Sequence, residues 1–257
     1  MIMQTQMPIV TVIVATLAED AAFYKTLESV LSQSDISVEF VGFIFDEKYD
    51  LANPDIKLQN LRGKQITLLR GKDGGIADAW NAAISYAQGT YLCFLGAGDY
   101  FCSADSLAAL LSSHSEMNVL SNSCLVFYGN QFIQLADQKI SPWLQQGDPN
   151  EKGLNRGMII PHASSLWPRV LWNSESFDRT FRIALDYEFA LRVSRQVQFV
   201  YVDCPAAIIQ PGGISNAPSH MLRVVKEDIR ARLKNGFSAR IFSVVNAKRI
   251  IRWLLMR

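Results

Sequence analysis

Strand-like and helix-like stretches alternate along the first hundred residues. The run IVTVIVA at 9–15 is continuously apolar and β-branched, which is typical of a strand buried on both faces. Further apolar runs predict three more strands, at 38–45, 65–69 and 91–95. Between them, apolar residues recur at helical spacing in 22–31 and 76–87. This alternation predicts an α/β fold with a mostly parallel central sheet flanked by helices.

The second half of the chain is less regular. Two apolar stretches, 123–128 and 131–135, flank Gly129-Asn130, and a two-residue connection of this kind predicts a β-hairpin. Helical spacing then returns in three segments, at 185–194, 221–234 and 239–256. We expect one domain over residues 1–220, followed by a basic helical extension over 221–257.

Charge is distributed unevenly along the chain. The whole sequence has 25 Lys and Arg against 24 Asp and Glu, so its near-neutrality gives no argument for a nucleic-acid partner. Residues 221–257 carry ten basic and two acidic residues, a net charge of +8, which leaves −7 for residues 1–220. Within that tail, Ala239–Arg257 has five basic residues, no acids, and Trp253 among leucines. Such a helix is typical of an anionic membrane surface, and packing on the body by its apolar face is the alternative.

The cysteines and the N-terminus point to the cytoplasm. The four cysteines have no C-x-x-C spacing and no nearby histidine, which favours reduced thiols over a zinc site. Met1–Gln6 has no basic segment typical of a signal peptide. The apolar run Ile9–Ala18 is much shorter than the roughly 20 residues that a membrane-spanning helix needs.

A glycine-rich turn and the end of a strand carry the candidate chemistry. Asp73-Gly74-Gly75 leads into the second predicted helix, and the first N–H groups of a helix favour anions. Asp78 and Asn81 share one face of that helix. The next strand ends in Gly96-Ala97-Gly98-Asp99, at the sheet edge where open α/β proteins bind ligands. A carboxylate placed there by glycines can approach a metal ion or a phosphate, and an ordinary turn is the alternative for Asp99.

These segments resemble the family 2 glycosyltransferases of the GT-A fold. The family signature reads roughly D-x-G-x-x-D-A-x-N-x-x-I, then A-x-G-x-Y, then F-L-x-x-x-D. The residues of this chain at those places are Asp73, Gly75, Asp78, Ala79, Asn81, Ile84, Ala87, Gly89, Tyr91, Phe94, Leu95 and Asp99. The resemblance extends over most of 7–215 and includes the stretch FDRTFRIALDYEFALRV at 177–193.

The resemblance implies an enzyme, a hexosyltransferase-like glycosyltransferase that acts with inversion in cell-surface polysaccharide biosynthesis. Its donor would be a nucleotide-diphospho-sugar, with a UDP-sugar expected first, and its acceptor a glycan or a lipid-linked glycan. Asp99 would then hold a divalent cation, Mn²⁺ or Mg²⁺, against the donor diphosphate. The chain departs from the family pattern at Gly98, where an acidic residue often precedes the last Asp.

The resemblance also assigns the catalytic base. Asp186 is the first acid of a D-Y-E triplet, and in the family this carboxylate deprotonates the acceptor hydroxyl. Asp186 and Glu188 are two residues apart, so on a helix they point in different directions and only one can act. A helix cap is the alternative for Asp186.

The remaining donor-site candidates are Thr16, Asp46, Asp73, Gly75, Asn81 and His162. Thr16 and Asp46 follow the first two strands, where relatives contact the base or the ribose. Loop solvation is the alternative for Asp46, because the usual family loop is not reproduced around it. His162 precedes the F-D motif at a place where relatives also have a histidine, which could contact the donor phosphates or the acceptor. A structural histidine is the alternative there.

Two other functional classes compete with this interpretation. A dinucleotide-dependent oxidoreductase is disfavoured, because no G-x-G-x-x-G follows the first strand. A degenerate, non-catalytic relative that scaffolds a polysaccharide-assembly complex stays open because of Gly98. For the glycosyltransferase we expect a cytoplasmic location, and the basic tail predicts a peripheral position on the inner face of the cytoplasmic membrane.

Overall fold

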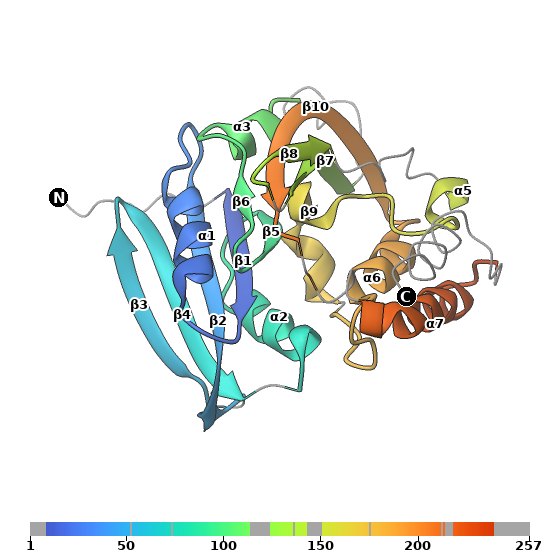
Figure 1. Cartoon of the computed structure of the whole chain (residues 1–257), viewed down its shortest axis with the longest axis horizontal. Helices are drawn as coiled ribbons and strands as arrows, with labels where there is room; N and C mark the ends of the chain where they lie inside the picture. Colours follow the sequence, from blue (N-terminus) through green and yellow to red (C-terminus); the bar gives the residue numbers. More distant parts are fainter. Residues whose placement is uncertain are drawn as a thin grey trace.

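The computed structural model describes residues 9–51, 53–72, 74–113, 124–135, 137–142, 151–174, 176–211, 213 and 218–238 (Figure 1). The strands are β1 (Val10–Thr16), β2 (Val38–Asp50), β3 (Asp55–Leu61), β4 (Lys64–Lys72), β5 (Tyr91–Gly96), β6 (Tyr100–Phe101), β7 (Cys124–Gln134), β8 (Ile140–Pro142), β9 (Ser165–Pro168) and β10 (Val197–Ile209). The α-helices are α1 (Ala21–Leu31), α2 (Ile76–Ile84), α3 (Ser106–Leu110), α5 (Glu151–Leu154), α6 (Leu185–Val193) and α7 (Met221–Lys234). Short 3₁₀ turns are η1 (His162–Ser164), η2 (Arg169–Asn173) and η4 (Pro218–His220).

All these strands join one sheet with the order β3-β4-β2-β1-β5-β9-β7-β10-β6, and β8 pairs with β7. Strands β4, β2, β1 and β5 run parallel, as the alternation of strands and helices predicts. Strand β9 is antiparallel to both β5 and β7, and so it connects the parallel half to the second half of the sheet. The predicted α/β fold with a mostly parallel core is confirmed.

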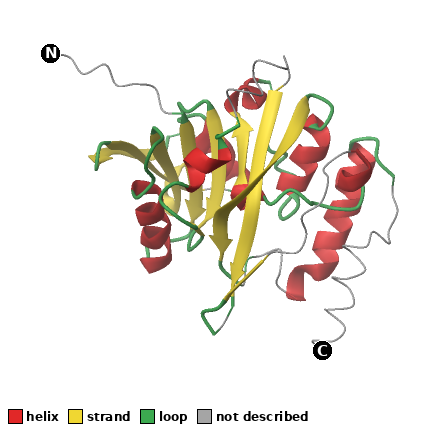
Figure 2. Ribbon diagram, turned by 90° about the horizontal axis from the view of Figure 1, so that it is seen from above, coloured by secondary structure: helices red, strands yellow, loops and turns green. Residues whose placement is uncertain are grey.

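Helices cover both faces of the sheet, and the sheet divides the core into two layers (Figure 2). One layer packs α1 through Phe23, Leu27 and Val30 against the side chains of β1 and β2 that face it. The other layer packs α2 and α6 against the opposite face, with Trp80 and Phe189 among its large rings. Alternate residues of β1, such as Val12 and Ile13, enter opposite layers. This explains why β1 is apolar without interruption.

The predicted hairpin at Gly129-Asn130 is wrong. Strand β7 runs unbroken through these residues and pairs in parallel with β10, whose register shifts between Tyr201 and Pro205. A Cβ at position 129 would lie 2.9 Å from the carbonyl oxygen of Cys204. The glycine therefore permits a close approach of two strand backbones, which is a second common reason for glycine inside a strand.

The sheet has an edge strand that the hydrophobic pattern does not predict. Six of the seven residues of β3 are exposed, so there is no buried face to produce a clear alternation. The predicted helix at 239–256 lies outside the described residues. Among the helices that are described, none is long and apolar enough to cross a membrane.

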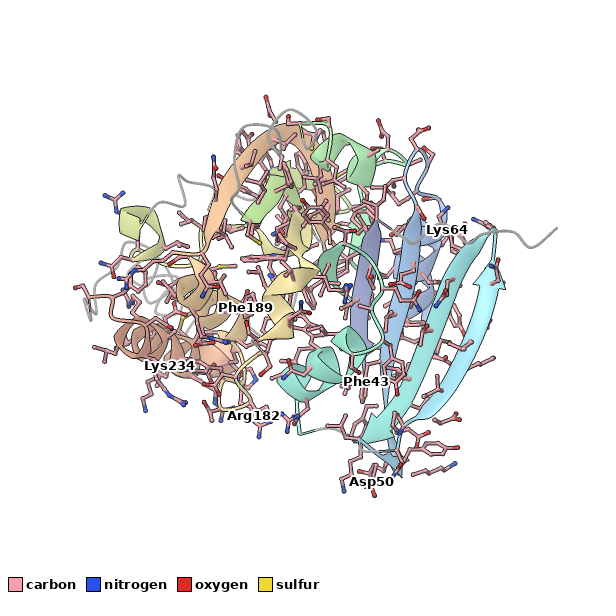
Figure 3. All side chains as sticks on the ribbon, turned by 180° about the vertical axis from the view of Figure 1, so that it is seen from behind. Phe43, Asp50, Lys64, Arg182, Phe189 and Lys234 are labelled. Carbon is pink, nitrogen blue, oxygen red and sulfur yellow. The ribbon has the colours of Figure 1, made fainter. Side chains whose placement is uncertain are left out.

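Helix α7 begins at the predicted domain boundary, between residues 220 and 221, and it packs against α6 (Figures 1 and 3). Its two acids are buried, with Glu227 8% and Asp228 4% exposed. Arg232 is fully buried and donates to the carbonyl oxygens of Asp228 and Asn155. The helix is therefore joined to the neighbouring elements by polar contacts as well as by its apolar face.

Candidate active site

Two of the predicted donor residues, Thr16 and Asp46, share one edge of the sheet with the turn that carries Asp99. The register pairs Thr16 at the end of β1 with Ile44 of β2, and Ala15 with Gly96 at the end of β5. Asp46 follows Ile44 by two residues, so it projects at the same edge. Asp73, another candidate, lies outside the described residues.

Asp99 closes the turn that follows β5. Its Oδ2 accepts the Gly96 N–H at 3.0 Å, and its Oδ1 accepts the Gln210 N–H at 2.8 Å. Because Gln210 follows β10, this carboxylate connects two strands that are not neighbours in the sheet. Burial raises the pKa of Asp99 to about 6, although these hydrogen bonds and the nearby Lys25 act in the opposite direction.

Gly98 has a backbone conformation that favours glycine. Its φ is +99°, and a Cβ there would lie 3.1 Å from Cγ of Gln210. The Gly98 N–H donates to the hydroxyl of Thr26 on α1 at 2.8 Å, and that hydroxyl donates to the Asp99 carbonyl oxygen at 2.7 Å. Gly98 is the position where the chain departs from the family pattern, and its positive φ favours glycine over an acidic residue.

Thr16 and Asp46 take part in local turns. The Thr16 hydroxyl donates to the Ala18 carbonyl oxygen at 2.9 Å, and Asp46 accepts the Lys48 N–H at 3.0 Å. Both side chains are partly exposed. Their predicted contacts with a base or ribose stay predictions.

The start of α2 packs directly against the segment that carries the F-D motif. A Cβ on Gly75, whose φ is +136°, would lie 2.5 Å from Nη1 of Arg182. Arg179 forms an ion pair with Asp78, with Nε and Oδ1 2.8 Å apart.

Asn81 completes this contact between α2 and the F-D segment. Its amide oxygen accepts the Phe177 N–H and its amide nitrogen donates to the Phe177 carbonyl, both at 2.9 Å. The visible role of Asn81 is to hold these two segments together, and its contact with a donor stays a prediction.

Asp186 and Glu188 lie in different surroundings. Among residues 183–191, Asp186 alone is not buried, and its Oδ1 accepts the Tyr187 N–H at 2.7 Å. Glu188 is fully buried and is bound by Arg192 at 3.0 Å and by Lys234 of α7 at 2.8 Å. Only Asp186 is therefore available to an external hydroxyl, while Glu188 belongs to an internal ion-pair network.

Lys234, which is labelled in Figure 3, extends this network to the F-D motif by binding Asp178 at 2.7 Å. Burial alone would raise the pKa of Asp178, but hydrogen bonds from Lys234 and Thr180 outweigh it and lower the pKa to about 2. The network borders an open cavity of about 400 Å³, lined by Ser176, Phe177, Asp178, Arg179, Arg192 and Lys234. Sequence reasoning missed Lys234, because it lies far along the chain in a segment interpreted as an extension.

His162 lies inside a cluster of aromatic rings. Its ring stacks on Phe94 with centroids 5.2 Å apart and packs against Trp80 at 5.3 Å. Both ring nitrogens are buried and have no hydrogen-bond partner in the described part of the chain. Burial lowers the pKa of His162, and the nearby negative charge of Asp186 partly opposes this. The histidine is thus close to the predicted base, and its contact with a donor or acceptor stays a prediction.

A divalent cation at the turn after β5 would be held by the carboxylate of Asp99. In the described part of the chain, no three His, Cys, Asp or Glu side chains converge to hold a metal ion. Each Asp99 oxygen accepts one backbone N–H and keeps a second lone pair. One partly exposed carboxylate fits an ion that takes its other ligands from phosphates and water, as Mg²⁺ commonly does.

Comparisons with known proteins identify the family of this chain. Residues 11–174 match the family described as glycosyl transferase family 2. A PGL/p-HBAD biosynthesis glycosyltransferase of Mycobacterium tuberculosis is 28% identical over 223 residues, which cover 81% of this chain and 80% of the relative. A chondroitin synthase of Pasteurella multocida is 24% identical over 179 residues, which cover 70% of this chain and 18% of that enzyme.

Two solved structures share the fold. Staphylococcus aureus TarS 1–349, solved in complex with UDP-GlcNAc, has a TM-score of 0.54 at 16% identity and covers 95% of this chain and 71% of TarS. The mannosyltransferase PcManGT of Pyrobaculum calidifontis, solved with GDP-Man and Mn²⁺, has a TM-score of 0.57 at 15% identity and covers 90% and 64% of the two chains. With a family match over most of its length and a GT-A fold, this chain belongs to glycosyl transferase family 2 and is a glycosyltransferase.

Proposed function

We propose that this glycosyltransferase moves a sugar from a nucleotide-diphospho-sugar to a hydroxyl of a glycan or lipid-linked glycan, with inversion at the anomeric carbon. The observation that carries the proposal is the direct packing of the α2 start on the 177–182 segment. This packing holds the start of α2, which follows the glycine-rich turn, against the segment that leads into α6 and Asp186. We infer that the donor is bound on the α2 side of this contact and the acceptor on the α6 side.

The donor side is supported by the fold neighbours, whose solved complexes hold UDP-GlcNAc or GDP-Man with Mn²⁺. We assign a UDP-sugar as the first donor to test. Asp99 would hold a divalent cation, and such an ion, when bound, offsets the negative charge that develops on a departing diphosphate. Because the chain offers this ion one carboxylate, we expect the cation to bind together with the donor and weakly on its own.

The acceptor side rests on Asp186. Its carboxylate would accept the proton of the acceptor hydroxyl while that oxygen forms a bond to the anomeric carbon. The bond from the anomeric carbon to the diphosphate oxygen breaks at the same time, and its electron pair leaves with the diphosphate. Holding the two reactants in line supplies a large part of the rate in such reactions.

The experiment that tests this function measures binding and turnover separately. Thermal unfolding is followed with UDP-, GDP- and dTDP-sugars, each with and without Mn²⁺. A donor at about 100 times its Kd stabilises the folded state by about 2.7 kcal/mol. Asp186→Asn should keep this shift and lower the rate of transfer about 100- to 10,000-fold. If the variant loses donor binding and thermal stability together, Asp186 is a structural cap.

A second candidate function is a non-catalytic scaffold, and one observation favours it. The carboxylate of Asp99 binds two backbone N–H groups, and Gly98 stands where relatives often have an acid. A scaffold would neither transfer sugar nor slowly hydrolyse a nucleotide-sugar. Release of free nucleotide diphosphate from any donor in the panel would exclude it.

We also propose a place for the enzyme, on the inner face of the cytoplasmic membrane in the synthesis of cell-surface polysaccharide. The exposed face of α7 carries Leu222 and Leu233, which are 62% and 57% exposed, beside exposed Arg223 and Lys226. Exposed leucines among basic side chains suit an anionic lipid surface. The relatives include a chondroitin synthase, whose product is a glycan. The basic tail after α7 would add to this surface.

A further inference from the structure

Glu227 of α7 binds the backbone immediately before α6. Its Oε2 accepts three consecutive N–H groups, from Arg182 at 3.1 Å, Ile183 at 2.8 Å and Ala184 at 3.0 Å. Its Oε1 also accepts the Arg182 N–H at 3.2 Å. With 8% of its surface exposed, Glu227 reaches this backbone from a helix that begins more than thirty residues later in the chain.

The carboxylate of Glu227 accepts the N–H groups at the start of α6, where the helix has no capping side chain of its own. Ala184 is the N-cap residue of α6 and has no side chain that can cap the helix. Successive backbone N–H groups at a helix start form a concave site with positive potential, and a carboxylate is a strong acceptor there. Without Glu227, three N–H groups in a buried turn would have to find other partners. The position of the first turn of α6 is therefore fixed from outside the helix.

The first turn of α6 carries Asp186, two residues after Ala184. Since its neighbours on both sides are buried, the direction of the Asp186 carboxylate is set by where the helix begins. Arg182, which gives its N–H to Glu227, lies with its guanidinium against Gly75 at the start of α2. The segment that Glu227 holds is thus in contact with the predicted donor side as well.

Helix α7 is itself held firmly at its other end. Lys234 binds both Asp178 and Glu188, and Arg232 donates to the Asn155 carbonyl oxygen at 3.2 Å. We propose that Glu227 is a positioning residue for the reaction, which holds the Asp186 carboxylate in line with the acceptor hydroxyl. The inference rests on the proposed role of Asp186 as the base.

Glu227→Leu removes the acceptor oxygens at similar volume and tests this role. We expect kcat to fall about 100-fold, the cost typical of a displacement of about 1 Å, while donor Kd changes less than 3-fold. Glu227→Gln keeps one acceptor oxygen and should restore kcat to within about 10-fold of the wild type. The matched control is Lys226→Gln, a change of charge at the exposed neighbouring position of the same helix.

A double variant separates positioning from general damage. If Glu227 acts through Asp186, adding Glu227→Leu to Asp186→Asn should lower kcat no further, because the base is already gone. If the Leu variant does not fold, Glu227→Gln decides: a kcat more than 3-fold below that of Lys226→Gln, with unchanged donor Kd, supports the inference. A folded Glu227→Leu variant that matches the control, or that loses donor affinity in parallel with kcat, overturns it. Where the Leu variant does not fold, a Gln variant with kcat within 3-fold of the control overturns it as well. If instead Asp186→Asn itself transfers sugar at the wild-type rate, the proposed base is wrong, whatever Glu227 does.

Discussion

His162→Phe should make the protein more stable and less active. A neutral imidazole carries one donor and one acceptor nitrogen, and both nitrogens of His162 are buried without a partner in the described structure. One buried unsatisfied polar group costs about 1–3 kcal/mol. A phenyl ring removes that cost and keeps the stacking on Phe94 and Trp80. We therefore expect the free energy of unfolding to rise by about 1–3 kcal/mol, or about 2–4 °C in Tm for each kcal/mol.

The pH dependence of this gain follows from the lowered pKa of His162. Below pH 6.5 the imidazole of the unfolded chain takes up a proton, while the buried imidazole of the folded chain stays neutral. Wild-type stability should therefore fall with decreasing pH, by at most about 1.4 kcal/mol per unit, until the folded-state pKa is reached. The Phe variant lacks this loss, so its advantage should grow between pH 7.5 and pH 5.

The assay combines urea denaturation at several pH values with donor titration and transfer rates. We expect donor affinity or transfer to fall about 5- to 10-fold, because a hydrogen bond contributes about 1 kcal/mol. His220→Phe, a half-buried histidine at the start of α7, is the control for adding a phenyl ring. Higher stability with unchanged binding and transfer would show that His162 is purely structural. Lower stability would show that its nitrogens have partners, such as ordered water, which refutes the reasoning.

Three other changes test separate parts of the molecule. Asp99→Asn keeps the side-chain size but accepts only one of the two backbone N–H groups, and it should abolish most of the increase in donor affinity that Mn²⁺ gives, as measured by calorimetry; an unchanged response to Mn²⁺ would contradict a cation at Asp99. Lys234→Met removes one of the two cations, Lys234 and Arg192, that bind Glu188 in the described part of the chain, and it should lower the free energy of unfolding by about 1–3 kcal/mol in urea, whereas an unchanged midpoint would show that the network adds no stability. Truncation after Ser238 keeps α7 and the buried Phe237, and it should weaken binding to anionic liposomes, with donor binding unchanged. Each basic residue near the surface contributes about 1 kcal/mol, and salt weakens it. A truncated protein that binds liposomes as tightly as the full chain, or that unfolds, would contradict an interfacial tail.

The sequence predicts the parallel half of the fold well, because strands buried on both faces and amphipathic helices leave strong periodic patterns. The prediction is wrong where one residue type serves two structural purposes, as glycine does in turns and at close approaches of two strands. The sequence predicts a turn at Gly129, whereas in the structure this glycine permits close packing of β7 against Cys204 of β10. The sequence also does not predict β3, because an exposed strand has no buried face to produce an alternating pattern.

The candidate site also contains residues that the sequence predicts and residues that it does not predict. Asp99 and Asp186 lie in local motifs, so the sequence identifies them as candidates. Glu227 and Lys234 act across the fold on residues that lie more than forty positions away, and no local motif marks them. One signal was present in the sequence: Glu227 and Asp228 are the acids of an otherwise basic segment, and both are buried. An acid that opposes the charge of its own helix is a reasonable candidate for an internal contact.

The backbone at Gly98 also limits how a stronger cation site could be engineered in this enzyme. An acidic side chain at that position would adopt a φ of +99°, which costs about 1–3 kcal/mol for a residue other than glycine, and its Cβ would lie 3.1 Å from the Gln210 side chain. Substituting Gly98 by an acid alone would therefore strain the turn that holds Asp99. A design that needs a second carboxylate for the cation must place it on another segment, or rebuild the turn together with Gln210.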